Sequence, residues 1–222
     1  MAHRAWISWS SGKDAAWALH VARQDTSLDV RGMLTTVTRD YGRVSMHAVR
    51  EELLRAQAEA VGLPLHVAYI PARCSNEDYE RAMRAAIDEA RAEGVTRMIF
   101  GDLSLEDVRA YRVEKMKGTG IEPLFPLWKR DTRQLAEEMV AAGVKAVVTC
   151  LDPRKMPREF AGRQFDAKFL AELPEGVDRC GENGEFHTFA WDGPAFSHPV
   201  AVRVGETVER EGFVFTDVVA VE

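Results

Sequence analysis

Apolar runs and amphipathic stretches alternate along the first part of the chain. Residues 5–9 and 30–37 are rich in residue types that favour buried strands, and residues 14–23 between them carry apolar side chains at helical spacing. Residues 47–61 place apolar side chains on one helical face, and residues 65–70 follow as another apolar run. The pattern predicts strand, helix, strand, helix, strand, which is the order that builds a parallel sheet.

The same alternation continues beyond this point. Asn76 is a candidate N-cap for a helix that ends near Gly94, and residues 98–102 predict the next strand. Asp131 and Gln134 have the spacing of a capping box, which predicts a further helix.

A short, almost fully apolar run at residues 145–151 predicts a fifth strand of the same sheet. Residues 1–150 are therefore expected to form an α/β domain, with a Rossmann-like parallel sheet that helices cover on both faces.

Proline and glycine residues change the pattern in residues 151–222, where they interrupt every periodic segment. One short helix near residues 165–173 and a terminal antiparallel strand pair within residues 200–221 are predicted there. We expect this part to be a smaller, loop-rich C-terminal domain that binds the substrate.

Charge is unevenly distributed between the two parts. The chain of 222 residues has a net charge of −6, and residues 1–150 carry 21 Lys and Arg against 21 Asp and Glu. Residues 151–222 carry 8 against 14, so the whole acidic excess is C-terminal. Neither part has the dense basic stripe typical of nucleic-acid-binding proteins, so a nucleic-acid partner is disfavoured.

Composition narrows the class of protein further. A hydrophobic content of 46% suffices for a packed core. No apolar run approaches the ~20 residues that span a bilayer, and the N-terminus has no signal-peptide pattern, so a cytoplasmic protein without membrane attachment is expected. Cys74, Cys150 and Cys180 lack the number and spacing of a disulfide framework or zinc site, which favours buried thiols. The oligomeric state is left open, a homodimer included.

A turn of small residues lies between the first predicted strand and its helix. Ser10, Ser11 and Gly12 lack bulky side chains, so their N–H groups can approach an anion. The following helix adds its unpaired N–H groups and the positive end of its dipole. The glycine spacing is not that of a Walker A loop, and Asp14 stands where that motif has Ser or Thr. The sequence predicts a phosphate-binding loop that ends in Lys13 and Asp14.

A second concentration of polar side chains lies at residues 178–189. Acidic, amide, imidazole and hydroxyl groups occur there together with two glycines that allow tight turns. A solvated acidic turn has the same composition. The flanking Phe186, Phe189 and Trp191 instead favour an ordered, functional loop that packs on the core.

Both segments resemble those of a known family. The string Ser10-Ser11-Gly12-Lys13-Asp14-Ala15 is similar to the Ser-Gly-Gly-x-Asp-Ser signature of the PP-loop ATP pyrophosphatases, which cleave ATP between its α- and β-phosphates. Combined with residues 181–188, it resembles the diphthine–ammonia ligase family, in its shorter prokaryotic form, over nearly the entire chain. The other matching strings are Gly101-Asp102-Leu103, Arg112 with Glu114, residues 123–128 and residues 147–152.

The resemblance implies a reaction in two steps. ATP would adenylate a substrate carboxylate with release of pyrophosphate, and ammonia would then displace AMP to leave an amide. The family's acceptor is diphthine, a modified histidine of a translation elongation factor. The expected partners are therefore ATP, ammonia and either that protein or a small carboxylate. Mg²⁺ is the expected cofactor, because pyrophosphate leaves readily only when its charge is neutralised.

For the first step, the resemblance assigns the nucleotide contacts to the phosphate loop. Asp14 is the expected magnesium ligand, although the helix dipole alone also favours an acidic residue there. Leu34 and Thr35 are placed beside adenine by analogy with related nucleotide folds. The expected nucleotide-binding residues are Ser10, Ser11, Gly12, Lys13, Asp14, Leu34, Thr35 and Asp102.

For the second step, carboxylates attract ammonium and can take its proton. Glu182 and Glu185 are the candidates, and His187 is either an alternative base or an ordinary hydrogen-bonded side chain. Eukaryotic members have an acidic residue at position 187 and glycine at position 183, so the acceptor can differ here. The expected catalytic residues are Lys13, Asp14, Glu182, Glu185 and His187, and the expected substrate contacts are Arg112, Glu114, Asn183 and Thr188.

Two other functions stay open. A tRNA-thiolating PP-loop enzyme would need a catalytic cysteine, for which Cys150 and Cys180 are available. Paired cysteines and a basic RNA-binding extension are absent from the sequence, however. A nucleotide sensor would bind ATP or AMP without turnover and would release no pyrophosphate.

Overall fold

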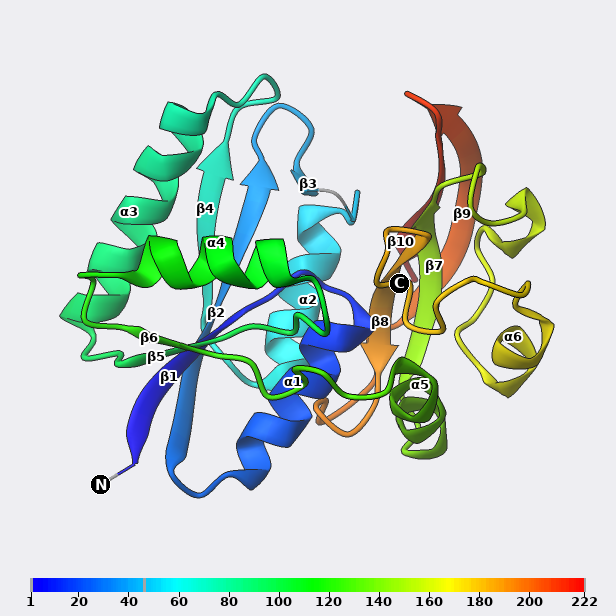
Figure 1. Ribbon diagram of the computed structural model, residues 1–222. Helices are drawn as coiled ribbons and strands as arrows, with labels where there is room; N and C mark the ends of the chain where they lie inside the picture. The colour runs from blue at the N-terminus through cyan, green and yellow to red at the C-terminus, as the bar shows by residue number, and fades with distance from the viewer. Residues whose placement is uncertain (1, 46, 222) are drawn as a thin grey trace.

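Two β-sheets, one mostly parallel and one antiparallel, form the framework of the computed structural model, which describes residues 2–45 and 47–221 (Figure 1). The first sheet has the strand order β3-β2-β1-β5-β6, and β4 also pairs with β2. All of these pairings are parallel except that of β2 with β3. The strands are β1 (His3–Ser8), β2 (Leu28–Thr38), β3 (Arg43–Val44), β4 (Leu65–Ile70), β5 (Arg97–Ile99) and β6 (Glu122–Leu124).

Helices cover both faces of this sheet, as predicted. Because neighbouring side chains of a strand point to opposite faces, Ile7 belongs to the core beside α1, and Trp6 belongs to the core beside α3. Figure 1 shows α1 and α2 on the side of the second sheet and α3 and α4 on the opposite side. The helices are α1 (Lys13–Gln24), α2 (Glu51–Val61), α3 (Asn76–Ala92) and α4 (Glu106–Met116).

The second sheet has the strand order β8-β7-β10-β9, and each pairing is antiparallel. The last two strands form the predicted terminal pair and turn at Glu211 and Gly212, whose φ angles are 52° and 81°. The elements of this part are α5 (Thr132–Ala141), β7 (Lys145–Leu151), the 3-10 helix η1 (Arg158–Phe160), α6 (Ala167–Glu172), β8 (Phe186–Asp192), β9 (Val202–Arg210) and β10 (Phe213–Ala220).

The strand expected to be fifth in the parallel sheet, β7, lies in the second sheet instead. It pairs with β8 and β10, both antiparallel, so that expectation is wrong. A continuous apolar run indicates a strand buried on both faces, and a central antiparallel strand meets this condition as well as a parallel one does. Every residue of β7 after Lys145 is buried. The division of the chain near residue 150 stays a prediction.

Helix ends follow local capping. The helix that precedes Gly62 begins later than expected, at Glu51, and Ser75 rather than Asn76 caps α3. Asp131 caps α5 as predicted, because its carboxylate accepts a hydrogen bond from the N–H of Gln134 at 2.9 Å.

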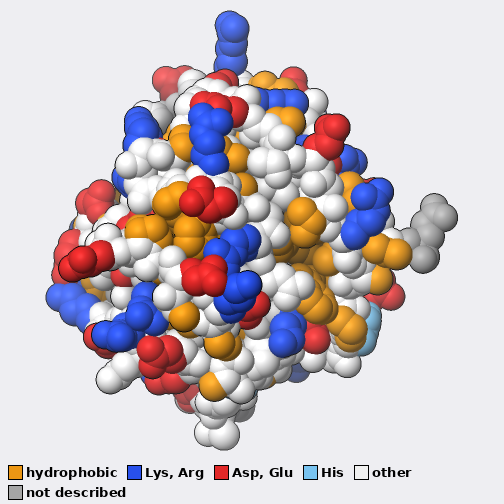
Figure 2. Space-filling model, turned by 90° about the vertical axis from the view of Figure 1, so that its right-hand side faces the viewer, with side chains coloured by type: hydrophobic (Ala, Val, Ile, Leu, Met, Phe, Trp, Pro, Cys, Tyr) orange, Lys and Arg blue, Asp and Glu red, His pale blue; other side chains and the backbone are white. Residues whose placement is uncertain are grey.

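Surface features bear on the expected partners. None of the helices in the described part of the chain combines the length and the apolar content that a bilayer crossing requires. On the face that the second sheet presents, Figure 2 shows acidic and basic side chains interspersed rather than gathered into one basic stripe.

Asp217 of β10 joins the second sheet to the first. Its carboxylate accepts hydrogen bonds from Arg50, just before α2, at 2.6 Å and from Arg43 of β3 at 2.9 Å. Burial raises the pKa of this carboxyl, but the hydrogen bonds from the two guanidinium groups outweigh that effect, and the pKa falls to about 2. The contact therefore stabilises the fold while Asp217 is ionised.

We expect Asp217→Asn to lower the free energy of unfolding at pH 7 by about 1 kcal/mol, because solvent partly screens the contact. The folded pKa lies below the ordinary value of 3.8, so this contribution is complete above about pH 4 and is lost as the pH falls towards 2. Urea unfolding between pH 7 and pH 2.5 measures both effects. The matched control is Asp29→Asn, which breaks an exposed pair with Arg31. Equal stability of the Asp217 variant and the wild type at pH 7 would contradict the account.

Candidate active site

A cavity of about 820 Å³ lies where the parallel strands end. The phosphate loop, the ends of β2 and β5, helices α3 and α4, and the segment 180–188 all contribute to its lining. Open α/β sheets bind ligands at this edge, and the volume falls in the range of small-molecule sites. Sequence-predicted residues that the structure brings together here include Ser10, Asp14, Leu34, Asp102, Glu182 and His187.

The phosphate loop has an unusual backbone conformation at Ser11. Its φ is 71°, in the left-handed region that non-glycine residues rarely adopt, and the residue is fully buried. Its carbonyl accepts hydrogen bonds from the N–H of Ala190 at 2.8 Å and from the side-chain amide of Gln57 at 3.0 Å. Strained residues persist where the surroundings fix them, and such positions cluster at functional sites.

Gln57 of α2 is a buried amide that connects three segments, and the sequence analysis missed it. Besides Ser11, its amide nitrogen donates to the carbonyl of Ala190 at 2.5 Å, and its oxygen accepts from the indole N–H of Trp9 at 2.9 Å. A polar residue on the apolar face of a helix was the only sequence sign of this role. Gln57 thereby links the phosphate loop to both sheets.

The start of α1 presents hydrogen-bond donors to the cavity. The N–H of Lys13 donates a hydrogen bond to the hydroxyl oxygen of Thr188 at 3.1 Å. Among the described residues, no acceptor pairs with the N–H of Asp14 or Ala15, and both residues line the cavity. A helix start with free N–H groups attracts phosphate or carboxylate oxygens.

The Lys13 side chain lies beneath the segment 178–185 and is not among the cavity-lining residues. Its ammonium donates to the Asp14 carboxylate at 2.9 Å and to the Cys180 carbonyl at 2.5 Å, and it lies 5.3 Å from the ring centre of Phe186. Burial lowers the pKa of Lys13, but the charge and hydrogen bond of Asp14 together with Cys180 and Asp178 outweigh it, so the pKa is above its ordinary value. Lys13 therefore stays charged and holds Asp14 in place.

Glu182 connects the segment 178–185 to the start of α4. Its Oε1 accepts the N–H groups of Ser104, Leu103 and Leu105 at 2.7, 3.2 and 3.3 Å. Among the described residues, no donor reaches its Oε2. Burial raises the pKa of Glu182, the backbone N–H groups oppose this, and the charge of Asp14 adds to it, so the pKa is raised overall.

Glu185 is buried and shapes the segment from inside. Oε1 accepts from the Asp178 N–H and the Asn183 side-chain amide, each at 3.1 Å, and Oε2 accepts from the Asn183 N–H at 2.9 Å. Its two oxygens therefore bind the segment itself, and Glu185 is not among the cavity-lining residues. Asn183, by contrast, lines the cavity.

Two histidines flank the phosphate loop. The rings of His47 and His187 lie 4.8 Å apart, and Nδ1 of His47 is 3.1 Å from the carbonyl oxygen of Thr188. Burial lowers the pKa of His47 to about 3, with His187 and Lys13 adding to the effect. Burial and the Lys13 charge also lower the pKa of His187. Both imidazoles are therefore neutral at pH 7.

The remaining predicted residues divide into two groups. Arg112 forms a bidentate pair with Asp102, at 2.7 and 3.3 Å, and both line the cavity. Thr35 lies on the other side of β2, where its hydroxyl donates to the Trp9 carbonyl at 2.8 Å, and its neighbour Thr36 lines the cavity instead. Glu114 is exposed, pairs with Lys117 and does not reach the cavity.

Two family models match most of this chain. The family model of the diphthamide synthase N-terminal domain matches residues 3–121, and that of the diphthamide synthase C-terminal domain matches residues 131–219. The chain belongs to the diphthamide synthase family. The resemblance found in the sequence is thereby confirmed.

Similar proteins named diphthine–ammonia ligase occur in animals and yeast. The rat protein is 29% identical over 199 residues, which cover 80% of this chain and 70% of the rat protein. The human protein is 28% identical over 197 residues, with the same coverage of 80% and 70%. The fission yeast protein is 25% identical over 184 residues, which are 73% of this chain and 29% of that protein.

Two carboxylates in the cavity of this diphthamide synthase family member are suitable Mg²⁺ ligands. Asp14 offers a partly exposed carboxylate at the cavity, with 31% of its side chain accessible, and Glu182 adds a second one. In the described residues, the one group of three close metal-ligand types is His66, Glu89 and Glu93, outside this cavity. Mg²⁺ is commonly held by one or two carboxylates together with substrate phosphates, and these residues fit that mode.

We expect the two functions of Glu182, hydrogen-bond acceptor and charge, to separate in variants. Glu182→Ala removes the acceptor of three N–H groups and should lower the free energy of unfolding by about 1–2 kcal/mol. Glu182→Gln keeps Oε1 as an acceptor and removes the ionisable carboxyl, whose pKa is raised in the folded state. Because a raised carboxyl pKa costs stability once the group ionises, the Gln variant should be at least as stable as the wild type at pH 7.

Urea unfolding at pH 7 measures both variants, with Glu159→Ala and Glu159→Gln at an exposed position as matched controls. The assignment fails if the Gln and Ala variants of Glu182 are destabilised equally.

Proposed function

We propose that this protein is an ATP-dependent ligase that converts a carboxylate into an amide. In the first step a carboxylate oxygen of the acceptor attacks the α-phosphorus of ATP, and pyrophosphate leaves. In the second step ammonia attacks the acyl carbon of the adenylate, AMP leaves with the bonding electron pair, and a proton is released. The observation that carries the proposal is the free helix start at Asp14 and Ala15, which lines one cavity together with Glu182.

The phosphate loop supports the first step. N–H groups that already point into the cavity can bind the phosphate chain without rearrangement, and they stabilise charge as pyrophosphate leaves. The strained backbone at Ser11 fixes these donors in advance. Asp14 would hold Mg²⁺, which neutralises charge on the phosphates when it is bound. Lys13 positions Asp14 through a buried ion pair.

Glu182 supports the second step better than the other candidates do. Its Oε2 is free in the described structure, and a raised pKa makes a carboxylate a better proton acceptor. The lowered pKa of His187 makes that imidazole a weaker base. Both carboxylate oxygens of Glu185 accept hydrogen bonds from its own segment, so Glu185 acts as a positioning residue.

The names of the relatives favour diphthine as the acceptor, because those proteins are named diphthine–ammonia ligases. The N-terminal and C-terminal family models together span the phosphate loop and the segment 178–188, the two parts that form the cavity. Diphthine is therefore the acceptor that the names of the relatives support best.

Thiol chemistry has little support. Burial raises the pKa of Cys150 to about 12, and burial also raises the pKa of Cys180, so both thiols stay protonated at neutral pH. The sulfur of Cys180 donates to the Thr132 carbonyl at 3.3 Å. These are properties of structural cysteines rather than of the nucleophile that a tRNA-thiolating enzyme would need.

We expect pyrophosphate and AMP to form when the protein is mixed with ATP, ammonium chloride and an acceptor carboxylate, tested as a diphthine peptide and as simple carboxylates. Asp14→Asn should lower the turnover by about 10²–10³-fold, because a charged ligand near the phosphates is lost. The matched control Asp29→Asn, at an exposed ion pair, should keep the wild-type rate. ATP binding without any pyrophosphate release would instead identify a nucleotide sensor.

A further inference from the structure

His47 and His187 meet beside the phosphate loop, although they lie far apart in the sequence. His47 precedes α2, His187 belongs to β8, and both line the large cavity. A Cβ atom added at Gly12 would lie 3.0 Å from Cε1 of His47 and 3.2 Å from the carbonyl oxygen of Thr188. Glycine at this position therefore allows the His47 ring to lie directly against the loop.

Each of the two imidazoles has one acceptor nitrogen without a partner. Because a carbonyl oxygen only accepts, Nδ1 of His47, 3.1 Å from the Thr188 carbonyl oxygen, carries the proton, and Nε2 keeps a lone pair. A neutral His187 likewise has one nitrogen with a lone pair. Within residues 2–45 and 47–221, no donor pairs with Nε2 of His47 or with either ring nitrogen of His187. Two unpaired acceptors thus belong to rings whose centres are 4.8 Å apart.

The surroundings of the two rings favour a neutral partner over a cationic one. Burial lowers the pKa of both histidines, and the charge of Lys13 contributes to this at each ring. The charge of Asp14 acts in the opposite direction at His187, but burial and Lys13 outweigh it. A cation between the rings would be repelled by Lys13 as well, whereas an uncharged molecule with N–H groups would not.

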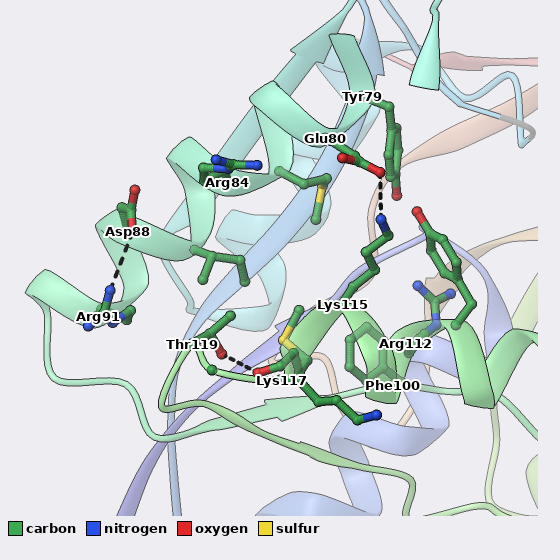
Figure 3. Close-up of a pocket in the computed structure, with 15 residues that line it drawn as sticks. Tyr79, Glu80, Arg84, Asp88, Arg91, Phe100, Arg112, Lys115, Lys117 and Thr119 are labelled. Carbon is green, nitrogen blue, oxygen red and sulfur yellow. Dashed lines mark hydrogen bonds and ion pairs between the residues drawn. The ribbon is translucent and has the colours of Figure 1, made fainter. Parts of the chain in front are cut away.

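Carboxylates are less suitable acceptors for a nitrogen nucleophile. A carboxylate stabilises ammonium, whose nitrogen has no lone pair with which to attack carbon. The smaller pocket of about 350 Å³ between α3 and α4 has two carboxylates, and both are paired already. Figure 3 shows Glu80 with Lys115, at 2.5 Å, on one side of this pocket. It shows Asp88 with Arg91, at 3.6 Å, on the other side. The histidine pair offers two uncharged acceptors instead.

We infer that His47 and His187 bind the second substrate as neutral ammonia, which donates one N–H group to the acceptor nitrogen of each ring. The inference rests on the proposed ligase function. Bound in this way, ammonia keeps its lone pair free to attack the acyl carbon of the adenylate. The C–O bond to AMP then breaks with its electron pair on the AMP oxygen. Glu182, which lines the same cavity, takes the proton that the nitrogen loses.

The first test separates the two steps in variants. Exchange of labelled pyrophosphate into ATP, measured with a diphthine peptide but without ammonium, reports the first step alone. His47→Asn keeps an amide N–H for the Thr188 carbonyl but lacks Nε2, and His187→Phe keeps the ring shape but lacks both nitrogens. Because one hydrogen bond to ammonia is lost, we expect each variant to raise the KM for ammonium chloride by about tenfold and to keep the exchange rate within about twofold of the wild type.

The matched controls are His198→Asn and His198→Phe, which make the same changes at an exposed histidine outside the cavity and should alter neither measurement. An unchanged KM for ammonium in a variant that keeps the exchange would overturn the inference and leave the ligase proposal standing. Loss of exchange in both variants would also overturn it, because the histidines would then serve the first step. Wild-type protein that shows no exchange and forms no AMP would overturn the ligase proposal, and the inference with it.

The second test distinguishes ammonia from ammonium as the bound form. Potassium ion has the charge and nearly the size of ammonium, so it competes for a cation site but not for a site of neutral ammonia. We expect KCl and NaCl at equal ionic strength to give the same KM for ammonium chloride with the wild-type protein. A KM that rises with KCl alone would identify a cation site and overturn the inference.

Discussion

The hydrogen bonds between β8 and the start of α1 determine the shape of the phosphate loop. The Ala190 N–H holds the carbonyl of Ser11 at 2.8 Å, and the Thr188 hydroxyl accepts the N–H of Lys13 at 3.1 Å. Ser11 adopts a backbone conformation that costs of order 1–3 kcal/mol and persists only where neighbours fix it. A strand of the second sheet therefore completes a loop of the first sheet, and the cavity forms where the two meet.

Charge balance beneath the loop follows from the same contact. The side chain of Lys13 is 1% exposed, and an isolated buried charge would cost several kcal/mol. Asp14 and the carbonyl of Cys180 compensate it, so the segment 178–185 has to cover Lys13 for the fold to be stable. The same segment places Glu182 on the start of α4. Stability and the arrangement of the cavity thus depend on one set of interactions.

Local patterns in the sequence predicted β1, β2, β4 and β5 and the helices α1, α2, α3 and α5, because apolar residues at strand or helical spacing have a direct structural meaning. The phosphate-binding role of the loop before α1 stays a prediction. The same patterns placed β7 in the wrong sheet, since an apolar run does not specify which strands will flank it. The segment treated as a loop up to residue 189 ends in the strand β8. A strand was not predicted there, because residues 186–190 are nearly all buried and do not alternate between apolar and polar types.

The site residues show the same limit. Ser10, Asp14 and Glu182 were predicted because they belong to short strings with a recognisable chemistry, and all three line the cavity. His47 and Gln57 were missed, because their roles arise from contacts with segments more than a hundred residues away. The hydrogen bonds that both oxygens of Glu185 accept within its own segment were not predicted either, because residue types alone do not specify hydrogen bonding within a turn.

Isotope transfer tests the central claim most directly. The protein would be incubated with ATP, ammonium chloride and an acceptor whose carboxylate oxygens are both ¹⁸O, and the AMP would be analysed by mass spectrometry. Because an acceptor oxygen attacks the α-phosphorus and leaves with AMP, the account predicts AMP that carries one ¹⁸O atom. Unlabelled AMP, or ADP in place of AMP, would contradict it.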